Sequence, residues 1–128
     1  MDRCTGDGDR EGHMLETHRF IQGVFAFQGR GFTNAVALEP RADYVVPAGK
    51  RAHLVYCRCG NPTSELICLV LKRDGKLTRY FPVGAKSGAQ MPHALVDDLL
   101  ANSEIEVVIA APEGLAGSVI IDMGFVEI

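Results

Sequence analysis

The stretch LICLVLKRDGKLTRYFPVG, residues 66–84, predicts a β-hairpin and with it the fold class. Branched aliphatic and aromatic residues, which favour strands, lie on both sides of Asp74-Gly75. Asp-Gly is a preferred pair for two-residue hairpin turns, because the tightest of these turns needs positive φ at both central positions. We therefore expect a tight turn at Asp74-Gly75, and counting outward from it places Cys68 opposite Phe81.

Similar strand-like segments follow one another along most of the chain. They are short, are separated by turn residues and recur at regular spacing, which is typical of a β-sandwich or a barrel. We expect an all-β protein, an antiparallel β-sandwich with a jelly-roll-like arrangement of about eight strands. At most one short helix is expected, within residues 91–103. The further strand segments are HRFIQGVFAFQG (18–29), GFTNAVAL (31–38), ADYVVPAGK (42–50), RAHLVYCRC (51–59), EIEVVIAAPEG (104–114) and GSVIIDMGFVEI (117–128).

The last of these segments, GSVIIDMGFVEI, is similar to the final strand of jelly-roll accessory and carbohydrate-binding domains. Such strands often end in an acidic residue followed by alternating apolar residues. The resemblance implies the fold alone, because one fold serves many functions.

Composition and length limit the classes of protein that fit. The chain has 128 residues, of which 47% are hydrophobic and 23% are charged, with a net charge of -3. We expect a single domain over residues 15–128 and a polar, disordered N-terminal segment over residues 1–14. There is no basic block for nucleic acid, no apolar run for a membrane span and no visible secretory signal. The expected location is the cytoplasm.

The cysteines pose the main chemical question. If GNPTSE, residues 60–65, closes a second hairpin, Cys57 lies opposite Cys68, and Cys57 and Cys59 share a face of their strand. Three thiols would then be close enough for a metal site or a disulfide. However, Cys-x-Cys along a strand is neither a zinc spacing nor the Cys-x-x-Cys redox motif. Packing of the sheet is therefore the preferred interpretation, and metal binding by the three cysteines is the weaker alternative.

One polar cluster is the candidate ligand site. His53, Arg58, Arg79 and Tyr80 lie on expected neighbouring strands, and an arginine can hold an anion with two hydrogen bonds. The competing interpretation is that both arginines face solvent.

No catalytic or cofactor motif is apparent, so no enzyme activity and no cofactor are predicted. The serines lack a G-x-S-x-G context, and the histidines are scattered. VGAKSGAQ, residues 83–90, lacks the Gly-Lys-Ser/Thr of a phosphate-binding loop, although glycine-rich loops on sandwiches often bind ligands.

The strand LICLVL, residues 66–71, is apolar on both faces, and one sandwich core can cover only one face. One face carries Ile67, Leu69 and Leu71, and the other carries Leu66, Cys68 and Val70. Monomers rarely leave large apolar patches exposed, so we expect a second subunit to cover one set. The sequence thus predicts a homo-oligomer.

These observations favour a non-catalytic binding or assembly module. Its partner would be a protein, a second copy of the chain or a small polar ligand. A lectin-like domain is the first alternative, with Tyr44, Tyr56 and Tyr80 stacking on a sugar, although the absence of tryptophan disfavours it. A small metal- or thiol-dependent protein using the cysteines and His53 is the second alternative.

Overall fold

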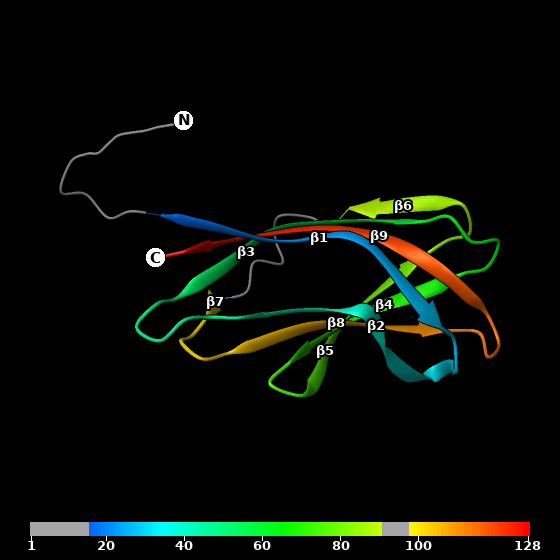
Figure 1. The fold of residues 1–128 in the computed structure, drawn as a ribbon, viewed down its shortest axis with the longest axis horizontal. Helices are drawn as coiled ribbons and strands as arrows, with labels where there is room; N and C mark the ends of the chain where they lie inside the picture. Colours follow the sequence, from blue (N-terminus) through cyan, green and yellow to red (C-terminus); the bar gives the residue numbers. More distant parts are fainter. Residues whose placement is uncertain (1–15, 91–97) are drawn as a thin grey trace.

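The computed structural model describes residues 16–90 and 98–128, and these residues form nine β-strands and no helix (Figure 1). The predicted all-β fold is confirmed. The strands are β1 (Thr17–Gln28), β2 (Gly31–Val45), β3 (Ala52–Asn61), β4 (Ile67–Arg73), β5 (Lys76–Val83), β6 (Ser87–Gln90), β7 (Asp98–Leu99), β8 (Glu104–Ala111) and β9 (Ala116–Glu127).

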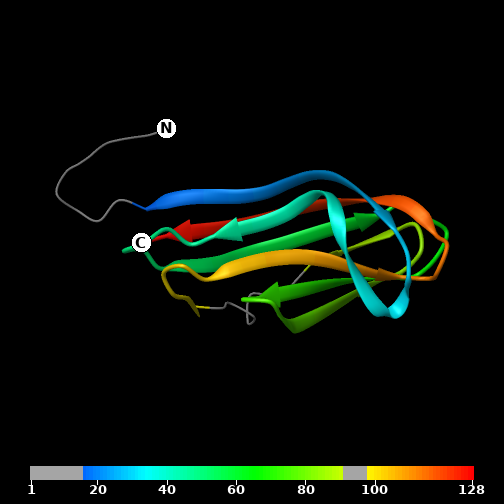
Figure 2. The same cartoon turned by 60° about the horizontal axis from the view of Figure 1, so that its bottom comes forward.

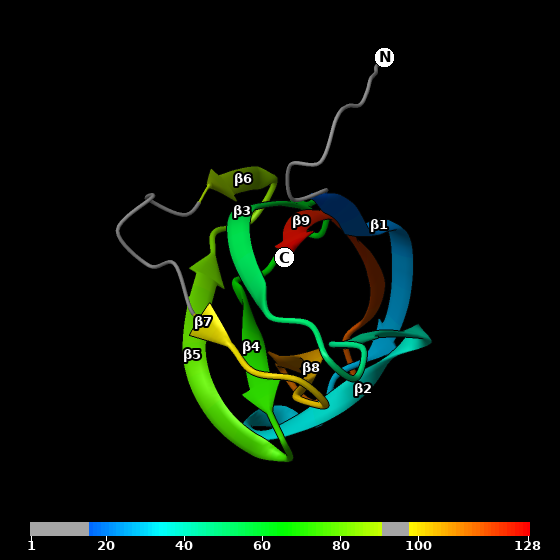
Figure 3. The same cartoon turned by 90° about the vertical axis from the view of Figure 1, so that its left-hand side faces the viewer.

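Two four-stranded antiparallel layers face one another around the core (Figure 3). The first, which we name the β1 sheet, has the order β6-β3-β9-β1, and the second, the β8 sheet, has the order β2-β8-β4-β5. Strands that follow one another in the chain mostly alternate between the layers, which is the connectivity of a jelly roll. The layers join through one bridge, between Ala26 of β1 and Glu39 of β2, and β7 pairs with the start of β3.

The core lies between the two sheets, and it takes every second residue of most strands. Ile67, Leu69 and Leu71 of β4 are at most 2% exposed, so their predicted common face is confirmed and it is the inner one. At one end of the core, the ring of Tyr44 stacks on Phe125 with 4.5 Å between the centroids. Among the described residues, no helix is long and apolar enough to cross a bilayer.

The predicted turn is confirmed, because Asp74 and Gly75 have φ values of 52° and 84°. The predicted register of its hairpin is wrong beyond the first pairs. Cys68 lies opposite Pro82, not Phe81, because β5 carries one extra residue at Thr78. The Thr78 hydroxyl donates a hydrogen bond to the carbonyl of the partner strand at a distance of 3.0 Å, which fixes this bulge.

The outer face of β4 is covered largely by the chain itself. Val70 is fully buried and packs with Val108 and Ala110 of β8, while Ala35 and Cys68 contact this small cluster from its edges. Ala35 reaches it because β2 leaves the β8 ladder in its first half, where Figure 2 shows the strand (cyan) curving away. The premise that a second subunit must cover this face is therefore wrong.

A second interruption of the β2–β8 ladder carries Arg41 onto the same outer face. Its guanidinium holds Glu106 with two hydrogen bonds of 3.0 Å and also lies 3.2 Å from Glu104 and 3.5 Å from Asp43. Glu106 is only 7% exposed, so this paired arrangement satisfies a carboxylate that is nearly buried. The outer face of the β8 sheet therefore carries a cluster of paired charges beside the covered region.

Two predictions fall outside the described residues. The disordered N-terminal segment over residues 1–14 is one of them. The short helix predicted within residues 91–103 is the other, because residues 91–97 are not described. The described residues 98–103 of that segment form β7 and a turn.

Replacing Gly75 tests the tight turn between β4 and β5. Its φ of 84° strains any β-branched residue, while a Cβ there would meet no atom within 4 Å, so the effect is one of backbone conformation alone. We expect Gly75→Val to lower the free energy of unfolding by about 1–3 kcal/mol in urea denaturation. Gly75→Asn is the matched control and should lose much less, because asparagine tolerates positive φ. Equal stability of the valine variant and the parent would place the turn elsewhere.

Candidate functional site

The structure separates the cysteines that the sequence placed together. Cys57 and Cys59 point from β3 into the core, where they are 5% and 9% exposed. Cys68 lies in the other sheet and faces outward, because the chain crosses from one sheet to the other between β3 and β4. The predicted pairing of Cys57 with Cys68 is therefore wrong. No group of three metal-ligating side chains occurs among residues 16–90 and 98–128.

Burial also changes the chemistry of these thiols. It raises the pKa of Cys57 to about 12, with a further contribution from the neighbouring Cys59 thiol. Burial likewise raises the pKa of Cys59 and Cys68. Because the thiolate is the form that attacks electrophiles and binds metals, this environment favours packing over thiol chemistry.

The reactivity of the three thiols in the native protein tests whether they serve packing or thiol chemistry. In a Cys4→Ser background, we expect Cys68 to react with Ellman's reagent in the native protein, because it is only half-buried. Cys57 and Cys59 should react only after denaturation, since raised pKa and burial both slow the reaction. Rapid native-state modification of all three thiols, at neutral pH, would contradict the packing interpretation and revive a thiol site.

The predicted polar cluster does not form either. His53 and Arg58 lie on β3 in the β1 sheet, whereas Arg79 and Tyr80 lie on β5 in the β8 sheet. Tyr80 is 58% exposed on the outer side of that second layer, and Arg79 is half-buried opposite Leu71. The prediction failed because it treated β3 and β5 as neighbours within one sheet.

The three tyrosines of the lectin-like alternative do not share one surface either. Tyr44 is inside the sandwich, where its hydroxyl donates a 2.5 Å hydrogen bond to the buried carboxylate of Glu127. Tyr56 and Tyr80 lie in different sheets. A shared stacking platform for a sugar is therefore absent from these three residues.

Arg58 instead belongs to a polar network on the outer face of the β1 sheet, centred on Asp122 of β9. The Asp122 carboxylate accepts hydrogen bonds from the Tyr56 hydroxyl at 2.7 Å, from Gln22 Nε2 at 2.8 Å and from Arg58 at 2.6 Å. These three donors hold the pKa of Asp122 below its usual value, the tyrosine contributing most. The network joins three adjacent strands, so it fixes the positions of these side chains.

A glycine lets this network lie flat on the sheet. Gly124 lies opposite Tyr56 in the β3–β9 ladder, and a side chain at Gly124 would overlap the tyrosine ring. The ring therefore covers the glycine backbone, an arrangement that shields an otherwise bare strand position. The guanidinium carbon of Arg58 lies 5.2 Å from the centre of the same ring, within the range of a cation–π contact.

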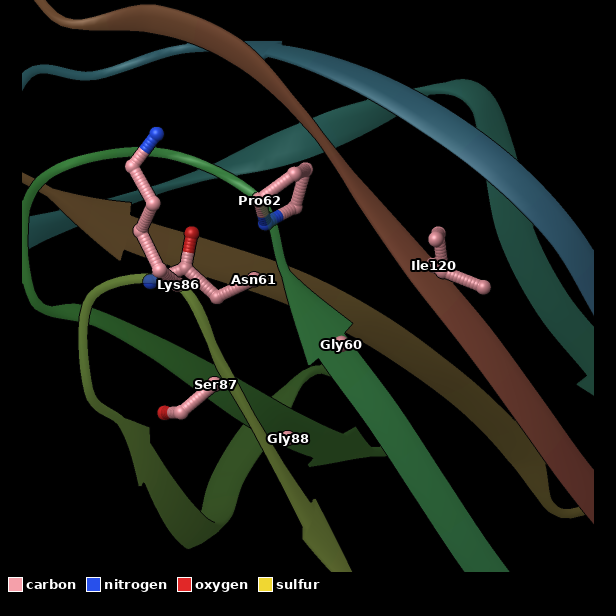
Figure 4. A pocket seen from close by; sticks show the side chains of 7 residues that line it. All are labelled: Gly60, Asn61, Pro62, Lys86, Ser87, Gly88 and Ile120. Atoms are coloured by element: carbon pink, nitrogen blue, oxygen red, sulfur yellow. The ribbon is translucent and has the colours of Figure 1, made fainter.

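Beside this network, two hollows adjoin one another along β3 and β6. The smaller, about 270 Å³, is lined by Tyr56, Arg58 and Gln90. The larger is an open hollow of about 540 Å³. They adjoin because Arg58 pairs with Gln90 and Gly60 with Gly88 in one ladder. The larger hollow is lined by Gly60, Asn61, Pro62, Lys86, Ser87, Gly88 and Ile120 (Figure 4).

We name the larger hollow the glycine trough, because two paired glycines form its floor. In Figure 4 Lys86 and Ile120 lie on opposite sides of it, and Gly60 and Gly88 lie between them without side chains. A Cβ at Gly60 would reach Ile120 at 3.8 Å, an ordinary contact, so a larger residue would fit there and fill the trough. The trough is therefore open because residue 60 is a glycine.

A buried amide holds the rim of the trough in place. The side chain of Asn61, 2% exposed, donates to the carbonyls of Glu65, Val83 and Gly84 at 2.8–3.1 Å and accepts from Thr63. These bonds tie the loop after β3 to the loop after β5. The backbone N–H of Lys86 adds a 2.9 Å bond to the Thr63 carbonyl.

Lys86 itself has an uncommon backbone conformation, with φ at 53°. Non-glycine residues with positive φ are a few per cent of all residues, and such strain often accompanies a functional position. Among the described residues, no carboxylate lies within salt-bridge distance of its ammonium group. The trough therefore has one cationic side available to a ligand.

Sequence reasoning singled out Arg58 but missed the trough. The available signal was two segments with turn residues, GNPTSE, which holds glycine, asparagine and proline, and VGAKSGAQ, which holds two glycines. Their contact depends on β3 and β6 being neighbours, which local sequence does not reveal.

Comparison with known proteins adds no relative to this picture. No protein-family model matches the chain, and no curated protein matches it.

Proposed function

We propose that the chain is a non-catalytic binding module, and that the glycine trough takes a small organic acid with an apolar body. The observation that carries this proposal is the pairing of a side-chain-free floor, Gly60 and Gly88, with an aliphatic wall and a lysine that no carboxylate of residues 16–90 and 98–128 pairs with. Small-ligand sites are mostly apolar, with a few polar groups that orient the ligand.

The apolar part of the ligand is supported by the shape of the trough. Its volume of about 540 Å³ is within the range of small-molecule sites. Ile120 is 50% exposed beside the glycine floor, and Pro62 lies at the rim. A flat ring or short alkyl group over the glycines would contact backbone and Ile120 together, removing exposed apolar surface from water.

The acidic part is supported by charge. The Lys86 ammonium is a compact charge on a flexible stem and suits a single carboxylate. At the opposite end, Arg58 is 57% exposed at its side chain and Gln90 faces it across the ladder. These two side chains offer hydrogen bonds to a second polar group of the ligand, while Asp122 holds the guanidinium in position.

Titration with phenylacetate, followed by the amide signals of the protein, tests this proposal. We expect chemical-shift changes concentrated at Gly60, Gly88 and Ile120, with saturable binding that weakens as salt rises. Phenylacetamide, which lacks the charge, should bind at least about fivefold more weakly, a difference of about 1 kcal/mol. Acetate, which lacks the apolar body, should cause no saturable change. Equal shifts with all three probes would contradict the proposed recognition.

Two variants and a control locate the site. Gly60→Val should abolish phenylacetate binding because its side chain fills the trough, and valine is favourable in a strand. Lys86→Gln should weaken phenylacetate binding but leave phenylacetamide binding unchanged. Lys76→Gln, an exposed lysine at the distant β4–β5 turn, is the matched control and should bind like the parent. If Gly60→Val binds phenylacetate normally, the ligand lies elsewhere.

A further inference from the structure

The apolar side of the glycine trough continues beyond Ile120. Gly60 of β3 pairs with Gly88 of β6 on one side and with Ile120 of β9 on the other. Ile120 in turn pairs with Val24 of β1, the last strand of the β1 sheet. These four residues therefore form one row across the whole outer face, which we name the apolar row. Ile120 and Val24 are 50% and 63% exposed in it.

Polar side chains border the apolar row without interrupting it. Two positions along each strand lies a second row, formed by Gln90, Arg58, Asp122 and Gln22. In that row Asp122 accepts hydrogen bonds from Arg58 at 2.6 Å and from Gln22 at 2.8 Å. These groups are occupied with one another, so a ligand on the apolar row need not strip water from an unpaired charge beside it.

Charge lies at one end of the apolar row. Lys86 borders the glycine end, and its ammonium meets no carboxylate of residues 16–90 and 98–128. From Gly88 to Val24 the row itself holds no charged side chain. The complementary ligand has one anionic head and an uncharged body. A single ring would cover only the trough, whereas an extended body would also cover Val24.

The length of the row fits an alkyl chain. Three steps between neighbouring strands, at about 4.8 Å each, give about 14 Å from Gly88 to Val24. A carbon–carbon bond of about 1.5 Å advances an extended chain by roughly 1.25 Å, so about eleven bonds cover this distance. A chain of twelve carbons therefore reaches Val24, and a chain of six carbons ends between Gly60 and Ile120.

We infer that the ligand of the glycine trough is a free straight-chain fatty acid, with its carboxylate at Lys86 and its alkyl chain along the apolar row to Val24. This inference rests on the proposed function and adds the identity of the apolar body. An esterified lipid chain has no carboxylate to offer Lys86, which is why the ligand is the free acid. Arg58 stays paired with Asp122 and is not needed for this ligand.

The dependence of affinity on chain length tests the inference. Hexanoate and dodecanoate are titrated into the protein below the concentrations at which they form micelles, and binding is followed by the amide signals. A methylene that is half covered on an open face should raise affinity about twofold. With six more methylenes, dodecanoate should bind at least about 30-fold more tightly than hexanoate. Its shift changes should extend to Val24, and those of hexanoate should not.

Three variants place the two ends of the chain. Val24→Gln should weaken dodecanoate binding about fivefold and leave hexanoate binding unchanged, because only the longer chain reaches this position. Lys86→Gln should weaken the binding of both acids by the same factor, since both share the head. Leu77→Gln, at a 47% exposed position of β5 in the other sheet, is the matched control for Val24→Gln and should bind both acids like the parent.

The outcomes separate this inference from the proposed function. Saturable phenylacetate binding together with equal affinities for hexanoate and dodecanoate would overturn the fatty acid and leave the proposed function intact. Dodecanoate binding that Val24→Gln leaves unchanged would also overturn it, because the chain would then lie elsewhere. If phenylacetate, hexanoate and dodecanoate all fail to bind, the proposed function itself is contradicted, and the inference with it.

Discussion

The amide of Asn61 is the polar group on which the arrangement of this sandwich depends most. It lies at the end of β3, where the chain leaves one sheet for the other, and it is 2% exposed. Its two amide hydrogens serve three backbone carbonyls, and its oxygen accepts from Thr63. Buried carbonyls need such donors, since an unsatisfied polar group in the interior costs about 1–3 kcal/mol. One side chain thus ties the end of β3 to the carbonyl of Glu65 before β4 and to the carbonyls of Val83 and Gly84 at the end of β5.

The same contacts explain why the trough has a fixed shape. The loop after β3 and the loop after β5 meet at Asn61, and the latter places Lys86 at the rim with φ at 53°. On the other side, the Asp122 network holds Arg58 against the ring of Tyr56. A ligand would meet groups that are already ordered, which lowers the entropic cost of binding. The candidate site is therefore a product of the same hydrogen bonds that close the sandwich.

Local sequence was sufficient for elements whose signals are local. Asp74-Gly75 indicated its turn because few residues accept positive φ, and the inner face of LICLVL followed from alternation. The bulge at Thr78 was not predictable, because one extra residue leaves no mark in the alternating pattern. It shifted every later pair of the hairpin by one position.

Contacts between distant segments were beyond local reasoning. GNPTSE has the composition of a hairpin loop, yet it connects two sheets, so β3 and β4 are not neighbours and the cysteines separate. The cover over Val70 was missed for a similar reason: it comes from Ala35, about a quarter of the chain earlier, in a strand that leaves its ladder. Of the four residues proposed for a ligand site, Arg58 lines the smaller hollow. Its partner Asp122 was not predictable, because it lies on a strand more than sixty residues away in sequence.

The free energy of unfolding of Asn61→Asp, measured in urea at neutral pH, tests most directly whether this amide holds the structure together. The change keeps the size of the side chain but replaces its donors with an acceptor and a charge that face three carbonyls. We predict a loss of at least about 3 kcal/mol. Asn34→Asp is the matched control, because Asn34 makes a single exposed bond to the Arg30 carbonyl, and it should change stability by less than about 0.5 kcal/mol. If Asn61→Asp is as stable as the parent, the sandwich does not depend on this amide.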